Sequence, residues 1–569
     1  MKSAPARGGG PAGARTAAAG ARNAAAVAET PDFLTRMRRG LLRKVAASGL
    51  YSHTLMGPVP ADVRVRIGER WPGDAQRGQA ILKGDIELAS ELVRNPAPVW
   101  FPQGAGPEWV AAWHGFAWLA DLMAVGASAR DAARALIRSW LAENGTWHPV
   151  SWRSDVLAGR LTSWLVHLDE IAHRDNDRAL RRAILASAAA QLRHLSRTAP
   201  WELVGAGRIA ALKGLIGGLI AFGRGEKRIA RAVRAFEREL GVQVLHDGGH
   251  LSRSPSMQLN VLRDLLDTRA TLRAGRVGAP PALQDAIDRM APMLRFFRHG
   301  DRRLALFNNS VEEDAVLVDL VLSKSETKGR PPNQATYSGF QRLQAGNSLV
   351  IVDTGNAPPP GYDDEAHAGV LSFELSQGRE RIIVNCGGYR GAKAAWRRVV
   401  RSSAAHSVMV VGDTNATEVN ADGTLGHGPR PVRIDRSEEG GHQWIAASHD
   451  GYRQRFGIVY SRELYLSREG DDLRGEDKLT GRSGIEFAVR FHLHPAVQAA
   501  LINDGAGAEL RLGDGSVWRL LASGAELSLG ESVYLGSGDV KKTQQIVLTG
   551  TTGPSGALVR WAIRRAGTL

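Results

Sequence analysis

The sequence predicts a helical toroid or solenoid followed by an antiparallel β-sandwich. Two observations carry this prediction. Apolar residues recur at spacings of three and four from about residue 31 to residue 307, and short β-branched runs with alternating polarity follow from about residue 302. Runs of strands after runs of helices place two different bodies side by side. At 569 residues the chain is too long for one core, so we expect two or three domains.

Residues 1–30 form the first segment and are rich in Ala, Gly and Arg, with almost no large apolar side chains. We expect a flexible tail here. A secretory signal needs a continuous apolar core after its positive start, and Ala17–Arg22 is too weakly hydrophobic to supply one. The longest apolar stretch, Gly214–Phe222, is too short for a membrane span, so none is predicted.

Residues 31–307 form the predicted helical domain. Roughly ten periodic segments are separated by short breaks that carry Gly, Pro or Asn. Trp113–Met123 and Leu157–Leu168 are typical segments. Repeated antiparallel helix pairs with short loops suit a toroid or a solenoid. Gly214, Gly217 and Gly218 fall inside one helical segment with no strand before it, so they predict close helix packing and not a phosphate loop.

Residues 308–569 form the predicted β-sandwich domain. Its short runs are bounded by Gly, Asp and Asn, and no helical pattern of comparable strength lies between them. The clearest runs are Ser348–Asp353, Arg381–Asn385, Ser407–Val411, Glu486–Leu493 and Gln545–Leu548. Many strands at close spacing are typical of an antiparallel sandwich.

The net charge of the chain indicates which kinds of partner it favours. The chain has 73 Lys and Arg against 58 Asp and Glu, a formal charge of +15, which favours polyanions such as nucleic acid, anionic lipid or acidic polysaccharide. No zinc-ribbon, helix-turn-helix or RNP pattern is visible, so nucleic acid is not predicted as a partner. Cys386 is the only cysteine, which excludes an intrachain disulfide and a multi-cysteine metal site.

Several motifs, taken in order, resemble the heparinase II/III family of polysaccharide lyases and their alginate-lyase-like relatives. The motifs are Asp247-Gly-Gly-His250 with Ser254-Pro255, Phe296–Asp301 leading to Ala305–Asn308, His367–Leu375, Val384–Tyr389, Arg401–His406 and Ser448–Tyr452. The resemblance implies an incomplete (α/α) toroid followed by an antiparallel β-sandwich. It also implies β-elimination at a uronic acid unit of an acidic polysaccharide, in the bacterial cell envelope or periplasm. Because no export signal is evident, the cytoplasm is the alternative location.

β-Elimination requires three groups. A cation or donor neutralises the C5 carboxylate, a base takes the C5 proton, and an acid protonates the departing glycosidic oxygen. The candidate acid and base residues are His406, Tyr389 and His250. The candidate substrate-binding residues are Arg208, Arg253, His367, Trp147 and Trp152. For each residue taken alone, the alternative is a structural role in a helix cap, a turn or the core.

The helical motifs depart from the family pattern at two positions. By this resemblance, active members carry a Gly-Asn-His pattern at the position of Gly205–Arg208. They carry a Tyr-His pair at the position of Met257 and Gln258. Both expected proton-transfer positions are therefore missing. Two alternatives to a lyase follow: a non-catalytic protein of the same fold that binds acidic polysaccharide, and a scaffold whose basic surface docks on acidic partners.

The strand motifs depart from the family pattern as well. The pattern His-x-His-x-Asp is reduced to Glu365-x-His367-x-Gly369, and Asn385 stands where an Asp is expected. A zinc site made of His367, Asn385 and His406 would lack its carboxylate. The sequence therefore predicts no bound metal and no cofactor, and it leaves the oligomeric state open.

Overall fold

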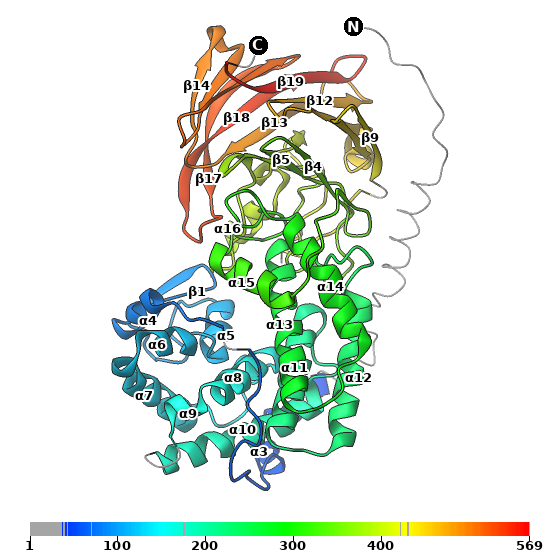
Figure 1. Ribbon diagram of the computed structural model, residues 1–569. Coiled ribbons are helices and arrows are strands. Elements are labelled where there is room, and N and C mark those ends of the chain that lie inside the picture. The colour runs from blue at the N-terminus through cyan, green and yellow to red at the C-terminus, as the bar shows by residue number, and fades with distance from the viewer. Residues whose placement is uncertain are drawn as a thin grey trace.

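The computed structural model describes residues 37, 40–41, 44–69, 71–173, 177–421, 423–429 and 432–567. Helices occupy the first half of the chain, and two large sheets occupy the second half (Figure 1). The predicted order of a helical body and an antiparallel β body is therefore confirmed. The predicted tail, residues 1–30, lies outside the described residues.

The helical half contains short and long helices joined by brief turns, together with one small hairpin. Its helices are α3 (Gly49–Thr54), α4 (Ala75–Leu82), α5 (Pro107–Gly115), α6 (Leu119–Val125), α7 (Ala127–Glu143), α8 (Ser154–Val166), α9 (Leu168–Ile171), α10 (Arg178–Thr198), α11 (Gly205–Ala221), α12 (Glu226–Gln243), α13 (Pro255–Ala274), α14 (Pro281–Phe296) and α15 (Ala315–Ser325). The hairpin is β1 (Asp85–Leu88) with β2 (Glu91–Arg94).

Helix α11 is at the centre of the helical half and packs against α8, α12 and α13. The predicted role of its glycines is confirmed at Gly214, where an added Cβ would lie 2.5 Å from Ala158 Cβ on α8. Gly218 similarly faces Leu192 on α10, where an added Cβ would lie 2.7 Å from Leu192 Cδ1. The missing side chains therefore set how closely these helices approach.

The second half contains the strands of the sandwich. They are β3 (Gln334–Ala335), β4 (Phe340–Ala345), β5 (Ser348–Asp353), β6 (Phe373–Gln377), β7 (Glu380–Val384), β8 (Met409–Val411), β9 (Arg433–Glu439), β10 (His442–His449), β11 (Val459–Leu466), β12 (Asp472–Thr480), β13 (Glu486–Leu493), β14 (Gln498–Ile502), β15 (Gly507–Arg511), β16 (Val517–Ser523), β17 (Glu526–Tyr534), β18 (Lys541–Thr551) and β19 (Ala557–Arg565). Helices α16 (Ala394–Arg401) and α17 (Arg453–Phe456) lie between strands.

Two antiparallel sheets form the sandwich. One has the order β14-β15-β16-β19-β12-β11-β10-β9, and the other has the order β17-β18-β13-β7-β6-β5-β4-β3, with β8 beside β13. In the eight-stranded sheet alternate residues are buried, as in Val459–Leu466 and Asp472–Thr480, whereas Ser348–Asp353 of the other sheet is buried at every residue. In this core Phe373 of one sheet stacks on Trp561 of the other, with ring centroids 5.6 Å apart.

A buried arginine connects the helices to the sheets. Arg253 lies just before α13, and its guanidinium forms an ion pair with Asp353 at the end of β5. Its Nε donates to Ser338 O at 2.7 Å and its Nη1 to Asn356 O at 2.9 Å. The same group lies over the ring of Phe340, 4.7 Å from the centroid. Each of its three guanidinium nitrogens therefore donates to the sandwich half.

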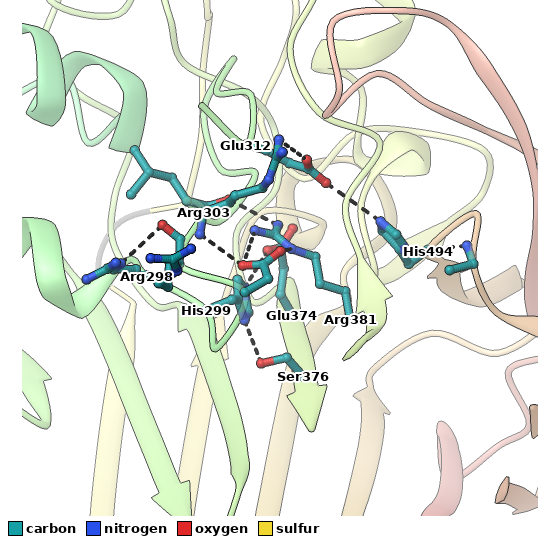
Figure 2. A network of polar contacts seen from close by, with 12 residues as sticks. Arg298, His299, Arg303, Glu312, Glu374, Ser376, Arg381 and His494 are labelled. Carbon is teal, nitrogen blue, oxygen red and sulfur yellow. Dashed lines mark hydrogen bonds and ion pairs between the residues drawn. The ribbon is translucent and has the colours of Figure 1, made fainter. Parts of the chain in front are cut away.

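A second polar network joins the halves on another side (Figure 2). His299 contacts Glu374 on β6 through Nε2, at 3.0 Å from Oε2. Arg381 on β7 forms an ion pair with Asp301 at 2.8 Å. Glu312 accepts a hydrogen bond from Tyr534 and lies 3.6 Å from His494 Nε2. These contacts fix the connecting segment between α14 and α15 against the nine-stranded sheet.

The helical core continues into the first strands of the sandwich. Its buried residues include Ala335, Phe340, Leu349 and Ile351 on β3, β4 and β5. Helix α15 ends at Ser325, after the boundary predicted at residues 307 and 308, and that boundary stays a prediction. Among the described residues, no helix combines the length and apolar character needed to cross a membrane.

The α8–α11 contact gives a stability prediction. Gly214→Ala should lower the free energy of unfolding by about 1–3 kcal/mol, because the new methyl group meets the Cα and Cβ of Ala158. Gly241→Ala, at an exposed position of α12 with no atom within 4 Å of the added Cβ, is the matched control and should be neutral or stabilising. Thermal unfolding of both variants measures the difference, and equal midpoints would contradict the packing argument.

The second network gives a pH prediction. Burial raises the pKa of Glu312, but His494, Arg381, Tyr534 and Arg303 outweigh it and lower the pKa from 4.5 to about 2. A carboxyl whose pKa is lower in the folded protein stabilises the fold at pH values above its unfolded pKa. Here this contribution to the free energy of unfolding is about 3 kcal/mol, and it is lost as the pH falls from about 5 to 2. Glu312→Gln should therefore be much less stable than the parent at pH 6.

The difference in thermal midpoint between Glu312→Gln and the parent should be large at pH 6 and smaller at pH 3. Glu526→Gln on exposed β17 serves as the control and should track the parent throughout. A gap that does not change with pH would show that the Glu312 carboxylate is not stabilised by its charge.

Candidate functional site

The predicted site residues lie on loops and turns, except Arg208, which lies within α11. The segment 247–253 is a turn before α13, which begins at Pro255 with Ser254 as its N-cap. His367 precedes β6, Tyr389 follows β7, and His406 lies between a 3-10 turn and β8. The segment from Asp247 to Pro255 thus leads into the start of a helix, and the segment that contains His367 leads into β6 at Phe373.

Two consecutive asparagines, which the sequence analysis did not single out as a pair, organise these loops. Asn308 Nδ2 donates to Arg253 O at 3.0 Å, and its Oδ1 accepts from His367 N at 3.1 Å. Asn309 accepts from Tyr389 N at 2.8 Å and donates to Glu365 at 2.8 Å. Both adopt left-handed backbone angles, with φ of 49° and 54°. An Asn pair outside a helix pattern is a usable signal, because Asn tolerates that conformation.

His250 is buried, and both of its ring nitrogens have partners inside the protein. Gln243 uses its amide nitrogen on Gly205 O and Glu239, so its Oε1 accepts from His250 Nε2 at 3.1 Å. His250 Nδ1 then accepts from Ser252 Oγ at 2.8 Å. Burial lowers the pKa of His250 to about 3, so the ring is neutral at pH 7. A catalytic role would require breaking both bonds.

Arg208, on the first turn of α11, is linked to His250 through Glu239 and Gln243. Its Nη1 forms an ion pair with Glu239 on α12 at 2.6 Å, and its Nε donates to Leu203 O at 2.6 Å. Glu239 also accepts from Gln243, which in turn holds His250. The positive charge predicted to neutralise a substrate carboxylate is therefore already neutralised by a carboxylate of the protein.

The remaining predicted substrate-binding residues of the helical half are built into its packing. Arg253 has the contacts to the sheets described above and is only 8% exposed. Trp152 is 2% exposed; its Nε1 donates to Asn144 O, and its ring meets His194 edge to face at 5.4 Å. Trp147 is half-buried and packs against the helical core. A sugar platform needs an open ring face, and Trp152 offers none.

His367 and His406 are brought together, as the sequence analysis expected. Their Nδ1 and Nε2 atoms lie 3.3 Å apart, and the rings are nearly perpendicular. Ser402 O can only accept, so His406 Nδ1 carries the hydrogen that donates to it at 2.8 Å. His406 Nε2 is then an acceptor, which makes His367 Nδ1 the donor between the rings. This assignment leaves His367 Nε2 as a lone pair, buried and without a hydrogen-bond partner.

Burial keeps both rings neutral. It lowers the pKa of His406 to about 4, and together with the neighbouring His406 and Arg401 it holds the pKa of His367 well below its usual value. His367 Nε2 is one ligand atom, whereas the side-chain nitrogen of Asn385 is a donor and cannot bind a metal. Within the described ranges, no group of three or more His, Cys, Asp or Glu is arranged to hold a metal ion.

Tyr389 packs beside helix α16 and is not part of the histidine pair. Its ring packs near Trp396 of α16, with centroids 6.2 Å apart, and the residue is half-buried. In the part of the chain that the structure describes, no hydrogen bond joins Tyr389 to His367 or His406. The geometry thus gives a histidine pair and a separate tyrosine, not a connected acid and base.

Two arginines near these loops are paired with carboxylates of the protein. Arg153 binds Asp155 through two hydrogen bonds of 2.7 and 2.8 Å, and Arg390 binds Glu365 at 3.0 Å. Burial raises the pKa of Asp364, and the neighbouring Asp363, Glu365 and Glu108 raise it further. The site therefore contains both positive and negative groups.

A shallow hollow of about 240 Å³ lies on β9, β10 and β11, and none of the predicted site residues lines it.

Comparison with known proteins identifies relatives of the whole chain. Residues 327–562 match the heparinase II/III-like C-terminal family. FtsZ-localized protein C of Caulobacter vibrioides is 30% identical over 570 residues, which cover 94% of this chain and 98% of that protein.

Solved structures agree with this assignment at the level of fold. The crystal structure of heparinase III superposes with a TM-score of 0.71 at 12% identity, covering 94% of this chain and 92% of that one. Heparan sulfate lyase HepC from Pedobacter heparinus gives 0.56 at 14% identity, covering 90% and 87%. The helical domain, the sandwich and the sequence match together show that the chain belongs to the heparinase II/III family.

Proposed function

We propose that this chain has kept the heparinase II/III fold without the elimination chemistry, and that it acts as an FtsZ-associated protein. The observation that carries the first half is Gln258. Its Oε1 accepts from His250 N at 2.7 Å, and its Nε2 donates to Gly248 O at 2.8 Å and Met290 O at 3.0 Å. An amide with every group in use, in place of the family's Tyr-His pair, can neither give nor take a proton.

The surrounding residues support the loss of catalysis. A substrate carboxylate brought to Arg208 would meet Glu239, so the arginine could neutralise it only by giving up its own partner. The unpartnered nitrogen of the histidine pair, His367 Nε2, belongs to a ring whose pKa lies far below the working range of a general base at neutral pH. Neither of the first two requirements of β-elimination is met.

The second half of the proposal rests on the relative from Caulobacter vibrioides. Its name states that it localises with FtsZ, and the likeness extends over nearly the full length of both chains. We propose the same localisation for this chain. The expected envelope or periplasmic location followed from the resemblance to lyases, and it becomes the competing outcome of the localisation experiment.

Retained lyase activity is the second candidate function. The observation in its favour is the adjoining pair of His367 and His406, in which one buried nitrogen lone pair has no partner. A polysaccharide that displaced neighbouring side chains would find a base there. Binding of an acidic polysaccharide without cleavage is the weaker form of the same idea.

A lyase assay separates these candidates. Purified protein incubated with heparan sulfate, alginate, hyaluronan or glucuronan should give no rise in the ultraviolet absorbance of a 4,5-unsaturated uronate, because the proton-transfer groups are missing. A rise that falls about a hundredfold in His406→Ala but not in the exposed control His53→Ala would establish catalysis and overturn the proposal. Affinity electrophoresis on the same polymers tests binding without cleavage.

A localisation experiment tests the FtsZ association. A fluorescent fusion of the full chain should gather where FtsZ gathers and disperse when FtsZ is depleted. His406→Ala should gather equally well, because no chemistry at that residue is needed for localisation. Recovery of the protein in the periplasm, or a pattern that ignores FtsZ depletion, would contradict the proposal.

A further inference from the structure

The hollow on β9, β10 and β11 lies on the outer face of the eight-stranded sheet, and β9 is one edge of that sheet (Figure 1). Along β10, Trp444, Ala446 and Ser448 alternate with Ile445 and Ala447, which are buried in the core of the sandwich. The first three side chains therefore point away from the core. The strand register places residues of β9 and β11 beside them on the same face.

A small residue flanked by two carboxylates forms one end of the hollow. Ala446 is the register partner of Asp435 on β9 and of Glu463 on β11. Both acidic residues are exposed. Within the part of the chain that the structure describes, neither carboxylate has a hydrogen bond or an ion pair. The two cannot serve as partners for each other, because they have the same charge.

The other end of the hollow contains hydroxyl groups and a cation. Ser448 is the register partner of Arg433 on β9 and of Ser461 on β11. Both serines are half-buried, and Arg433 is exposed. Among the described residues, no partner binds the two hydroxyls or the guanidinium. The hollow therefore presents donors and acceptors on a floor of small side chains.

Charges elsewhere on the same face of the sheet are paired across strands. Glu476 on β12 pairs with Arg560 on β19 at 2.9 Å, and Asp472 pairs with Arg564 at 3.1 Å. Cross-strand ion pairs thus form on this face where opposite charges are neighbours. At the hollow the register instead places Ala446 between two carboxylates, so their binding capacity remains open.

An aromatic pair borders the hollow at its acidic end. Trp444 precedes Ala446 by two residues on β10, and Tyr465 follows Glu463 by two residues on β11. The two rings have centroids 5.1 Å apart. The Tyr465 hydroxyl is bonded to His442 Nδ1 at 2.9 Å, which fixes its ring. Trp444 is 36% exposed and is the ring that remains available to a ligand.

These groups select the chemistry of a ligand. A carboxylate only accepts hydrogen bonds and a guanidinium only donates them, whereas a hydroxyl group does both. A ligand with several hydroxyl groups can therefore bind Asp435, Glu463 and Arg433 at the same time. We propose that the hollow binds one pyranose unit of an uncharged oligosaccharide, with Trp444 against the apolar face of the sugar ring.

Charge separates this ligand from an acidic polysaccharide. Two carboxylates and one guanidinium line the hollow, so a uronate would meet more negative than positive charge. A cationic ligand would satisfy the carboxylates but would leave Arg433 opposed by a like charge. The inferred site differs from the loops around His367 in both position and ligand. It goes beyond the FtsZ association and does not rest on it.

Isothermal titration calorimetry with the full chain tests the proposal. The probes are maltohexaose, cellohexaose, xylohexaose and chitohexaose, which are uncharged, and hexamannuronate, which is acidic. At least one uncharged probe should bind, and hexamannuronate should not. Trp444→Ala should weaken that binding about tenfold or more, because the stacking surface is removed. Asp435→Asn with Glu463→Gln should weaken it as well, because hydrogen bonds to a charged acceptor are the stronger ones.

The matched control is Tyr337→Ala, which removes a ring that is 43% exposed elsewhere on the molecule. The control should bind the sugar like the parent, and all variants should keep the parent's thermal midpoint. Absence of binding to every uncharged probe would overturn the proposal, and so would binding that Trp444→Ala leaves unchanged. Tighter binding of hexamannuronate that Trp444→Ala abolishes would show an acidic ligand at the hollow and would also overturn it.

Discussion

The buried ion pair between Arg253 and Asp353 is the interaction on which the arrangement of the two halves depends. It lies where α13 begins and β5 ends, and the rest of the guanidinium is held by backbone carbonyls of the sandwich. Removing one partner of such a pair leaves an uncompensated buried charge, which typically costs about 3–5 kcal/mol. The loop that carries His367 is tied to this connection, because Asn308 binds both Arg253 and His367.

The motif that first suggested catalysis in the helical half has a structural explanation. Asp247 accepts from Tyr337 N at 2.8 Å and from Ser338 N at 2.7 Å, both in the sandwich half. Gly248 has a φ of 85°, and an added Cβ would lie 2.0 Å from Arg289 O, so only glycine fits. With His250 bound to Gln243 and Ser252, the segment Asp247–Arg253 serves to join the halves. This motif therefore has a structural role that does not depend on catalysis.

The sequence was sufficient to predict the order of helices and strands, because hydrophobic periodicity is a local property of the chain. It also paired His367 with His406 and explained Gly214. It could not show that Glu239, 31 residues beyond Arg208, neutralises it, or that Gln243 and Ser252 occupy both nitrogens of His250. Such assignments depend on which helices are neighbours in space. The burial of Trp152 is a fact of the same kind, since an exposed and a buried tryptophan look alike in sequence.

The shared core of the two halves has a consequence for how the protein can be divided. Phe340, Leu349 and Ile351 belong to strands of the sandwich, yet they are buried in the core of the helical domain. A fragment that began at residue 327, where the family match begins, would present these side chains to water along one end of its sheet. The family boundary is therefore not a boundary of autonomous folding. The sandwich alone would expose an apolar end that favours aggregation, and the helical domain covers that end in the full chain.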